Sequence, residues 1–318
     1  KFYRTESASH STRNDGARFD YDSISTFSSV ASAAMQDYYN QLGMQTSFNA
    51  YSYYGHTPLT AAMFSVKYEF TDNTPSLPTN MTEIGSQTYS TGNNAASTVH
   101  LYEYNNTLPL GFMVNMSTEA NWNKETGNPF TTQNSFVKTA IDSDANIFHQ
   151  LQTTDTVGTF TAKYQLEEDD NYKPSGDAAT YDVYFYCVTS SETLTVNITN
   201  GSITDDNSTT KTFSSTNQNY ICHVGNVSAG STITVTASDG QALTTCYAYA
   251  FDNDAWETAY KLLNKNPYTV ESYSDTKITG KVTAKKQGIM YTSIPYDKGW
   301  NVYVDGVKSK TTSICSGA

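Results

Sequence analysis

Two patterns of hydrophobic and polar residues follow one another along the chain. Up to residue 152, apolar residues occur at both helical and strand spacing, which predicts a mixed α/β domain over 1–152. Residues 24–42 follow the helical period, with Ser25 as the predicted N-cap and Gly43 just past the end. Strands are predicted at 66–71, 99–104 and 111–115, and a short helix at 135–141 capped by Thr132.

From 153 to 251 the chain changes to short segments in which apolar and polar residues alternate. These segments are GTFTAKYQL, TYDVYFYCV, ETLTVNIT, NYICHVG, STITVTA and TTCYAYAF. Gly, Asp, Asn and Ser fill the turns between them, which predicts a β-sandwich of jelly-roll type. Residues 252–267 predict a short connecting helix, in which Asp254 and Glu257 form a capping box and Pro267 forbids continuation.

Residues 268–318 predict a second β-sandwich module that is related to the first and incomplete. KVTAKKQ at 281–287 resembles TFTAKYQ at 159–165, and VYVDGVKS corresponds to LTVNITNGS, which indicates a faint internal repeat. The predicted fold class is therefore α+β. It is a mixed α/β domain followed by two jelly-roll-like sandwich modules that a short helix joins.

The segment IPYDKGWNVYVDG, at 294–306, carries the clearest strand signal of the C-terminal part. Val302 and Val304 alternate around one residue of the opposite face, and Asp305-Gly306 marks a tight two-residue turn. We expect Trp300 to be substantially buried where this strand begins, because an indole removes a large area from water.

Composition and charge narrow the classes of partner. The chain has 19 Lys and Arg against 31 Asp and Glu, a net charge of −12, and no basic run. We therefore expect neither nucleic acid nor an anionic membrane surface as a partner. No stretch approaches 18 consecutive apolar residues, so no membrane span is predicted. Lys1 is not an initiator residue, and both ends are typical of a piece excised from a longer protein.

The four cysteines, Cys187, Cys222, Cys246 and Cys315, each lie in a strand-like run without C-x-x-C or metal-ligand spacing. In such a run a buried thiol behaves as a small apolar side chain, so we expect the four cysteines to be buried.

Motifs of catalysis are missing from the sequence, since there is no G-x-S-x-G, Walker or G-x-G-x-x-G pattern. The five histidines are scattered, and we expect each to be a surface or packing residue. Asp252 and Asp254 are best explained by helix capping, with a calcium site as the alternative. No cofactor is predicted.

An aromatic loop is the best candidate for ligand binding. It holds Tyr51, Tyr53, Tyr54 and His56, and Trp122 is a further candidate. Tyrosine and tryptophan rings can stack on the apolar face of a sugar while their polar tips reach hydroxyl groups. The alternative is that these rings fold back on the predicted first helix.

Several segments resemble, in the same order, the extracellular domain of YfhO-like bacterial multi-pass membrane proteins. They are KFYRTES, STFSSVASAAMQDYYNQLG, GHTPLTAAMFSVKYEF, TLPLGFMVN, NPFTTQN and IPYDKGWNVYVDG. The resemblance covers most of the chain and implies an outer-surface domain that transmembrane helices outside this chain tether to the cell membrane. It also implies a Gram-positive type of host, in which disulfides are often absent, so we expect the four cysteines to be mostly reduced. Cys187 and Cys222 form the pair for which this expectation is to be tested first.

The resemblance further implies a parent that looks like a glycosyltransferase using polyprenyl-phosphate sugars, with catalytic carboxylates outside this chain. The part present here would position a cell-surface glycan or polymer such as teichoic acid, next to its own transmembrane region. Two alternatives stay open at this point. One is a structural or protein-interaction module that braces the membrane part, and the other is a free-standing glycosidase.

Overall fold

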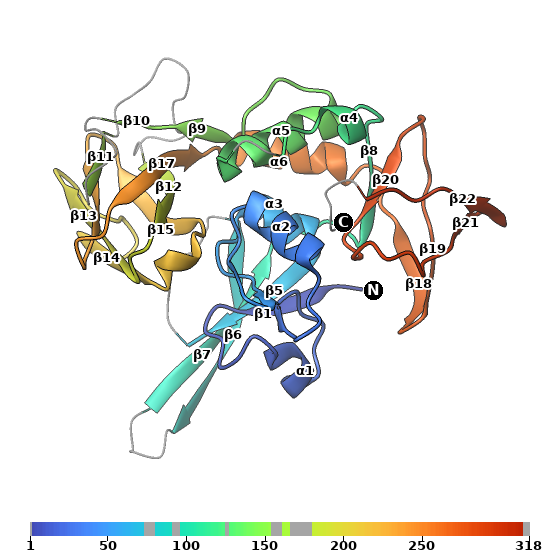
Figure 1. Ribbon diagram of the computed structural model, residues 1–318, viewed down its shortest axis with the longest axis horizontal. Coiled ribbons are helices and arrows are strands. Elements are labelled where there is room, and N and C mark those ends of the chain that lie inside the picture. The colour runs from blue at the N-terminus through green and yellow to red at the C-terminus, as the bar shows by residue number, and fades with distance from the viewer. Residues whose placement is uncertain are drawn as a thin grey trace.

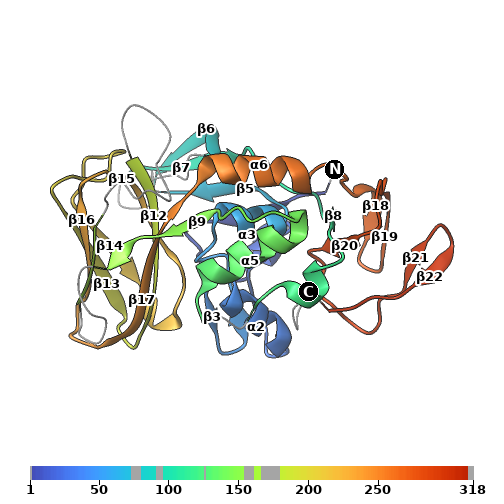
Figure 2. The same cartoon turned by 90° about the horizontal axis from the view of Figure 1, so that it is seen from above.

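The computed structural model describes residues 2–72, 80–90, 96–124, 127–153, 161–165 and 180–313. A β-sandwich forms one end of the molecule, a mixed α/β part lies in the middle, and small β ribbons form the opposite end (Figures 1 and 2). The broad α+β class predicted from the sequence is confirmed.

The mixed α/β part is built on a four-stranded sheet in the order β1-β5-β7-β6. Its strands are β1 (Arg4–Ser7), β5 (Val66–Thr71), β7 (Ala96–Tyr104) and β6 (Met81–Ser90). β1 runs parallel to β5 and the other pairs are antiparallel. The helices of this part are α1 (Asp15–Phe19), α2 (Ala33–Gln41), α3 (Pro58–Met63), α4 (Thr118–Asn121) and α5 (Pro129–Ile141). A small sheet of β2 (Thr26–Phe27), β4 (Ala50–Tyr51) and β3 (Thr46–Ser47) lies beside them.

Two helix starts differ from the prediction. α2 begins at Ala33 with Ser32 as its N-cap, because the Ser25 hydroxyl donates instead to the buried Glu6 carboxylate, 3.1 Å away. α5 begins at Pro129, where Asn128 rather than Thr132 accepts hydrogen bonds from the first backbone N–H groups. A proline at the first helical position is already set in the helical conformation.

The sandwich consists of a five-stranded sheet, β10-β11-β16-β13-β14, and a four-stranded sheet, β15-β12-β17-β9. The strands are β9 (Phe148–Gln150), β10 (Gln152–Thr153), β11 (Thr161–Gln165), β12 (Thr180–Thr189), β13 (Thr193–Thr199), β14 (Thr210–Ser214), β15 (Cys222–Ser228), β16 (Thr232–Ala237) and β17 (Leu243–Phe251). All six predicted strands of this region are present. Both sheets contribute to one apolar core, as expected of a sandwich.

The four-stranded sheet is buried on both faces. On β12, Val183 and Phe185 lie in the sandwich core, whereas Tyr184 and Tyr186 belong to the core of the mixed α/β part. Successive side chains of a strand point to opposite faces, so one sheet serves two cores. Tyr249 and Phe251 on β17 also join the core of the mixed α/β part. The two parts are thus packed together through this sheet.

α6 (Asn253–Leu263) confirms the predicted helix within 252–267. Its N-cap is Asp252, whose side chain accepts a hydrogen bond from the Ala255 N–H at 2.9 Å, and not Asp254. Trp256 and Leu263 are fully buried in the same core as α2 and α5.

The predicted second sandwich is not present in the described part of residues 268–318. β18 (Thr269–Ser274) pairs only with β19 (Lys277–Lys281), and β21 (Val302–Val304) only with β22 (Val307–Ser309). β20 (Ile289–Thr292) instead pairs with β8 (Gly111–Val114) of the mixed α/β part. The jelly-roll topology is likewise not confirmed for the first sandwich, and the boundaries at 152, 251 and 267 stay predictions.

The internal repeat was wrong. Thr161–Gln165 of TFTAKYQ is a strand, whereas KVTAKKQ leaves its strand after Lys281. Both segments share a strand-forming composition without occupying equivalent positions in a sheet.

The tight turn in the C-terminal hairpin is confirmed, and the burial of Trp300 is only partial. Asp305 and Gly306 have φ angles of 49° and 81°, as the preferred two-residue hairpin turn requires. Trp300 is half-buried and precedes β21 instead of beginning it. The reason is that no second sheet covers this ribbon in the described part of the chain.

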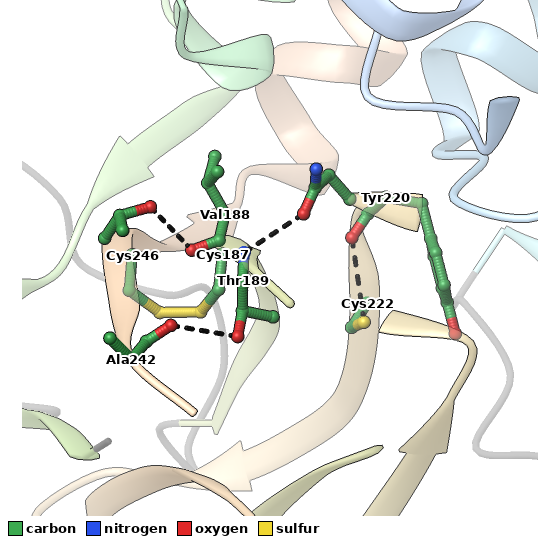
Figure 3. The surroundings of a disulfide bond; sticks show 9 residues. Cys187, Val188, Thr189, Tyr220, Cys222, Ala242 and Cys246 are labelled. Carbon is green, nitrogen blue, oxygen red and sulfur yellow. Dashed lines mark hydrogen bonds between the residues drawn. A yellow bond between two sulfur atoms is a disulfide. The ribbon is translucent and has the colours of Figure 1, made fainter. Parts of the chain in front are cut away.

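A disulfide joins Cys187 on β12 to Cys246 on β17, which corrects the expectation of reduced cysteines (Figure 3). The two residues are direct cross-strand partners, whereas Cys222 pairs in register with Phe185 on the other side of β12. Cys222 is free and buried, as expected, and burial raises the pKa of its thiol. Cys315 lies outside the described residues.

The disulfide predicts a thiol count. Reduction of the denatured chain should expose two further thiols, Cys187 and Cys246, beyond those that are free without reductant. Cys222→Ala, a control that leaves the disulfide intact, should lower the unreduced count by one. Replacing both Cys187 and Cys246 by alanine should lower the free energy of unfolding by about 2–5 kcal/mol. Four free thiols without reductant would contradict this pairing.

Candidate functional site

The aromatic loop singled out in the sequence connects β4 to α3 and lies against the sandwich. Gly55, at φ +85°, allows a close approach, because a Cβ there would lie 2.4 Å from the Gly43 carbonyl oxygen and 2.9 Å from Tyr220 Cβ. The Ile221 N–H donates to the same Gly43 carbonyl at 2.8 Å. Thr57 then caps α3, so the loop is fixed at both ends.

Tyr53 points into the protein and is fully buried. Its hydroxyl lies 2.7 Å from Glu69 Oε2 and 2.6 Å from the Tyr104 hydroxyl. Trp122 is also buried, and its indole N–H donates to the Thr132 carbonyl at 2.9 Å. Neither ring offers a face to a sugar in this conformation. Tyr53 is directed to the sheet residues Glu69 and Tyr104, and not to the predicted first helix.

His56 covers Tyr53 and is partly exposed. The two rings are stacked, with centroids 3.8 Å apart and planes 8° from parallel. Nδ1 of His56 lies 3.2 Å from the Tyr53 carbonyl oxygen, and Nε2 lies 3.5 Å from Glu69 Oε2. Burial lowers the pKa of His56, and the Glu69 carboxylate opposes that shift. Near neutral pH the imidazole therefore acts as a neutral, fixed hydrogen-bonding group beside the remaining loop rings.

All five histidines have a carboxylate neighbour that their sequence spacing did not reveal. The pairs are His10 with Glu6 and Asp15, His56 with Glu69, His100 with Glu83, His149 with Asp252, and His223 with Asp182. Most partners come from distant parts of the chain, because strands of the same sheet or of packed parts bring them together. The sequence alone does not indicate which carboxylate lies beside each histidine.

One of these groups has the order of a Ser-His-Asp triad. His10 Nε2 lies 3.4 Å from Ser25 Oγ, and His10 Nδ1 lies 3.9 Å from Asp15 Oδ2. However, the Ser25 hydroxyl donates to Glu6 and accepts the Tyr53 N–H at 2.9 Å, and Ser25 is buried. A nucleophile must reach substrate, so this arrangement is a structural network.

Burial shifts the pKa values of the carboxyl and the imidazole of this network in opposite directions. Glu6 is fully buried, and desolvation raises its pKa to about 7 even though Ser23, Ser25 and the Ile24 N–H donate to it. Burial also lowers the pKa of His10. The contact between the two side chains, at 3.8 Å, therefore joins two groups whose charged forms burial disfavours.

At the surface of the loop, polar and aromatic side chains of the mixed α/β part meet those of the sandwich. We call this group the junction cluster, and its members are Arg13, Gln45, Tyr54, Gln218 and Tyr220. Arg13 donates to Gln218 Oε1 at 2.7 Å and to Gln45 Oε1 at 3.0 Å. The rings of Tyr54 and Tyr220 are 6.5 Å apart, and both are partly exposed. Ligand sites often form where two packed parts meet.

Of the residues predicted for ligand binding, Tyr54 alone belongs to the junction cluster. His56 lies close by on the same loop, whereas Tyr51 packs on Tyr39 with ring centroids 4.6 Å apart. Tyr220 was missed because it lies 166 positions further along, beside a strand of the sandwich. Its only sequence signal was an aromatic residue before the segment ICHVG.

Of the acidic pair considered for calcium, Asp252 has a structural role. Asp252 caps α6 and lies 3.3 Å from His149 Nε2. Burial raises the pKa of Asp252, but the hydrogen bonds from His149 and the Ala255 N–H outweigh it and hold the pKa below its usual range. Among the described residues no group of three or more His, Cys, Asp or Glu side chains could hold a metal ion.

The comparison with known proteins identifies a family. The profile of the family described as bacterial membrane protein YfhO matches residues 1–317. Neither a curated protein nor a solved structure matches the chain. Within the described residues, none of the helices has the length and apolar character needed to cross a bilayer.

Glu6 predicts a pH dependence of stability. Its folded-state pKa, about 7, lies above its unfolded value, so its stabilising contribution is complete at low pH and is lost as pH rises through 7. Glu6→Gln removes this titration. The unfolding free energy of the natural chain minus that of the variant should therefore fall by about 3 kcal/mol between pH 4.5 and 8.

Urea unfolding at several pH values measures this difference. Glu103→Gln serves as the matched control, because Glu103 is partly exposed and pairs with Lys67 at the surface. Its difference curve should stay nearly flat over the same range. A flat curve for Glu6→Gln as well would show that Glu6 is solvated in the folded chain.

Proposed function

Because the chain belongs to the YfhO family of bacterial membrane proteins, we propose that it is the outer-surface soluble part of a membrane glycosyltransferase-like protein. In this role it positions a glycan or acceptor polymer, such as teichoic acid, while the membrane part carries out sugar transfer. The catalytic carboxylates and the lipid-carrier site then belong to the membrane part of the parent.

The junction cluster is the observation that carries the proposal. Tyr54 and Tyr220 present partly exposed rings of the kind that stack on sugars, and Arg13 and Gln218 present donors and acceptors that suit hydroxyl or phosphate groups. The shared sheet holds these side chains together from two parts of the chain, so little ordering is needed on binding.

The disulfide between Cys187 and Cys246 supports an outer-surface location. Disulfides persist in oxidising surroundings and are rare in proteins that the cytosolic thiol pool keeps reduced. A buried bond of this kind agrees with a domain exposed outside the cell membrane.

The second candidate, a structural brace for the membrane part, is favoured by the burial of Tyr53 and Trp122. The predicted ligand loop then serves chiefly to pack the mixed α/β part on the sandwich. A free-standing glycosidase has less support, because Glu6 and Asp15 are buried and their oxygens accept hydrogen bonds from their neighbours. We expect no sugar transfer and no glycoside hydrolysis by the chain alone.

Glycan binding should be weak and centred on the junction cluster. Titration with glycerol-phosphate polymer that carries sugar substituents should give a dissociation constant of about 1 mM, because a few stacked rings leave little free energy after ordering costs. Tyr54→Ala and Tyr220→Ala should each weaken binding about fivefold. Saturation-transfer NMR on the polymer measures the affinity.

Tyr89→Ala is the matched control, because Tyr89 is 43% exposed on β6, away from the cluster. It should leave the affinity unchanged, and polymer without sugar should bind more weakly. Tyr53→Ala is not a binding test, since it removes a buried ring and its hydrogen bonds. If the natural chain, Tyr54→Ala, Tyr220→Ala and the Tyr89→Ala control all fail to bind the polymer, the structural brace becomes the better explanation.

A further inference from the structure

Positive charge is concentrated in one C-terminal segment of an acidic chain. Residues 277–310 contain seven lysines and two aspartates, so the charge of this segment is +5. Because the whole chain has a net charge of −12, the other residues together carry −17. All seven lysines are exposed. Within the described residues, Lys281 pairs with Glu271 and the remaining six have no ion-pair partner. The chain therefore has a basic end that its average charge conceals.

The β21–β22 ribbon in this segment exposes apolar side chains at its tip. Val304 and Val307 face each other across the turn and are 53% and 69% exposed. Tyr303 is 61% exposed beside its cross-strand partner Lys308. Before the ribbon, Tyr296 is 42% exposed and lies two positions ahead of Lys298. Tyrosine, valine and lysine next to the Asp305-Gly306 turn combine an apolar surface with cationic ends.

The β21–β22 ribbon is not expected to be stable on its own. Two-stranded hairpins are at best marginally stable in water, and among the described strands β21 and β22 pair only with each other. Both views place this ribbon and the β18–β19 ribbon at the end of the molecule opposite the sandwich (Figures 1 and 2). The exposed tip thus lies where a large external surface can approach it.

We infer that the β21–β22 ribbon docks on the surface of an anionic lipid bilayer. Val304, Val307 and Tyr303 enter the boundary between headgroups and acyl chains, while Lys298, Lys308 and Lys310 extend to lipid phosphates. The membrane-protein family of the chain means that its parent resides at a bilayer. Charge complementarity selects a bilayer with anionic headgroups.

The charge of the remaining chain orients the molecule on this surface. A charge of −17 outside the basic segment is repelled by anionic lipid, so the sandwich end faces away from the bilayer. The expectation that an anionic membrane is excluded rested on the net charge of −12, which averages over these two unequal regions. Screening confines the attraction to groups within about 10 Å of the lipid at ordinary salt.

Trp300 provides a local reporter of docking. The chain has three tryptophans, and Trp122 and Trp256 are buried, so Trp300 is the one beside the ribbon that lipid can reach. Vesicles of phosphatidylglycerol and phosphatidylcholine with brominated acyl chains should quench its fluorescence. Pure phosphatidylcholine vesicles should quench it much less, and raising the salt should reverse the effect.

Two double variants separate the apolar and the charged contributions. Lys298→Gln with Lys308→Gln should lower the vesicle partition coefficient about 25-fold at low salt, about fivefold for each lysine. Val304→Ser with Val307→Ser should lower it about tenfold, because both side chains lose their place in the acyl boundary. The exposed positions of these residues mean that all variants should fold, which circular dichroism verifies.

The matched controls remove apolar side chains or positive charges at exposed positions outside the ribbon. Val30→Ser with Phe48→Ser replaces two apolar residues that are each 87% exposed, and Arg18→Gln with Lys261→Gln removes two exposed charges. Both controls should bind vesicles as the natural chain does. Absence of quenching by the anionic vesicles, or an equal loss of vesicle binding in the controls, would overturn the proposal.

Discussion

The double burial of the β15-β12-β17-β9 sheet is the constraint on which the rest of the structure depends. Along β12 the side chains alternate between two cores, with Val183 and Phe185 on one side and Tyr184 and Tyr186 on the other. This packing fixes the sandwich against the mixed α/β part. It therefore brings Tyr220 beside Tyr54 and Gln218 beside Arg13, so the junction cluster exists only because the two parts share a sheet.

The same packing changes the interpretation of the aromatic loop. Tyr53 turns inward to Glu69 and Tyr104, which leaves Tyr54 and its neighbour from the sandwich as the exposed rings. The opposite end of the molecule has no such support. There the β21–β22 ribbon keeps apolar residues in water, and its lysines give it the charge that an anionic surface attracts. The glycan site that we propose thus lies where the sandwich meets the mixed α/β part, and the membrane-docking ribbon that we propose lies at the end opposite the sandwich.

Local patterns predicted local structure well and long-range contacts poorly. The strand at Val66–Thr71, the six sandwich strands and the Asp305-Gly306 turn follow from alternation and turn residues. The pairing of β20 with β8 and the bond between Cys187 and Cys246 depend on partners far away in the sequence. For the candidate site, Tyr54 could be predicted, whereas Tyr220 could be found only once the sheet had brought it there.

Hydrogen exchange tests most directly whether the shared sheet makes the two parts one cooperative unit. Val183→Ala affects the sandwich core and Tyr184→Ala the core of the mixed α/β part. The account predicts that each variant lowers the protection of the slowest amides in both β5 and β13 by the same factor. It would be contradicted if Val183→Ala affected only β13 and Tyr184→Ala affected only β5.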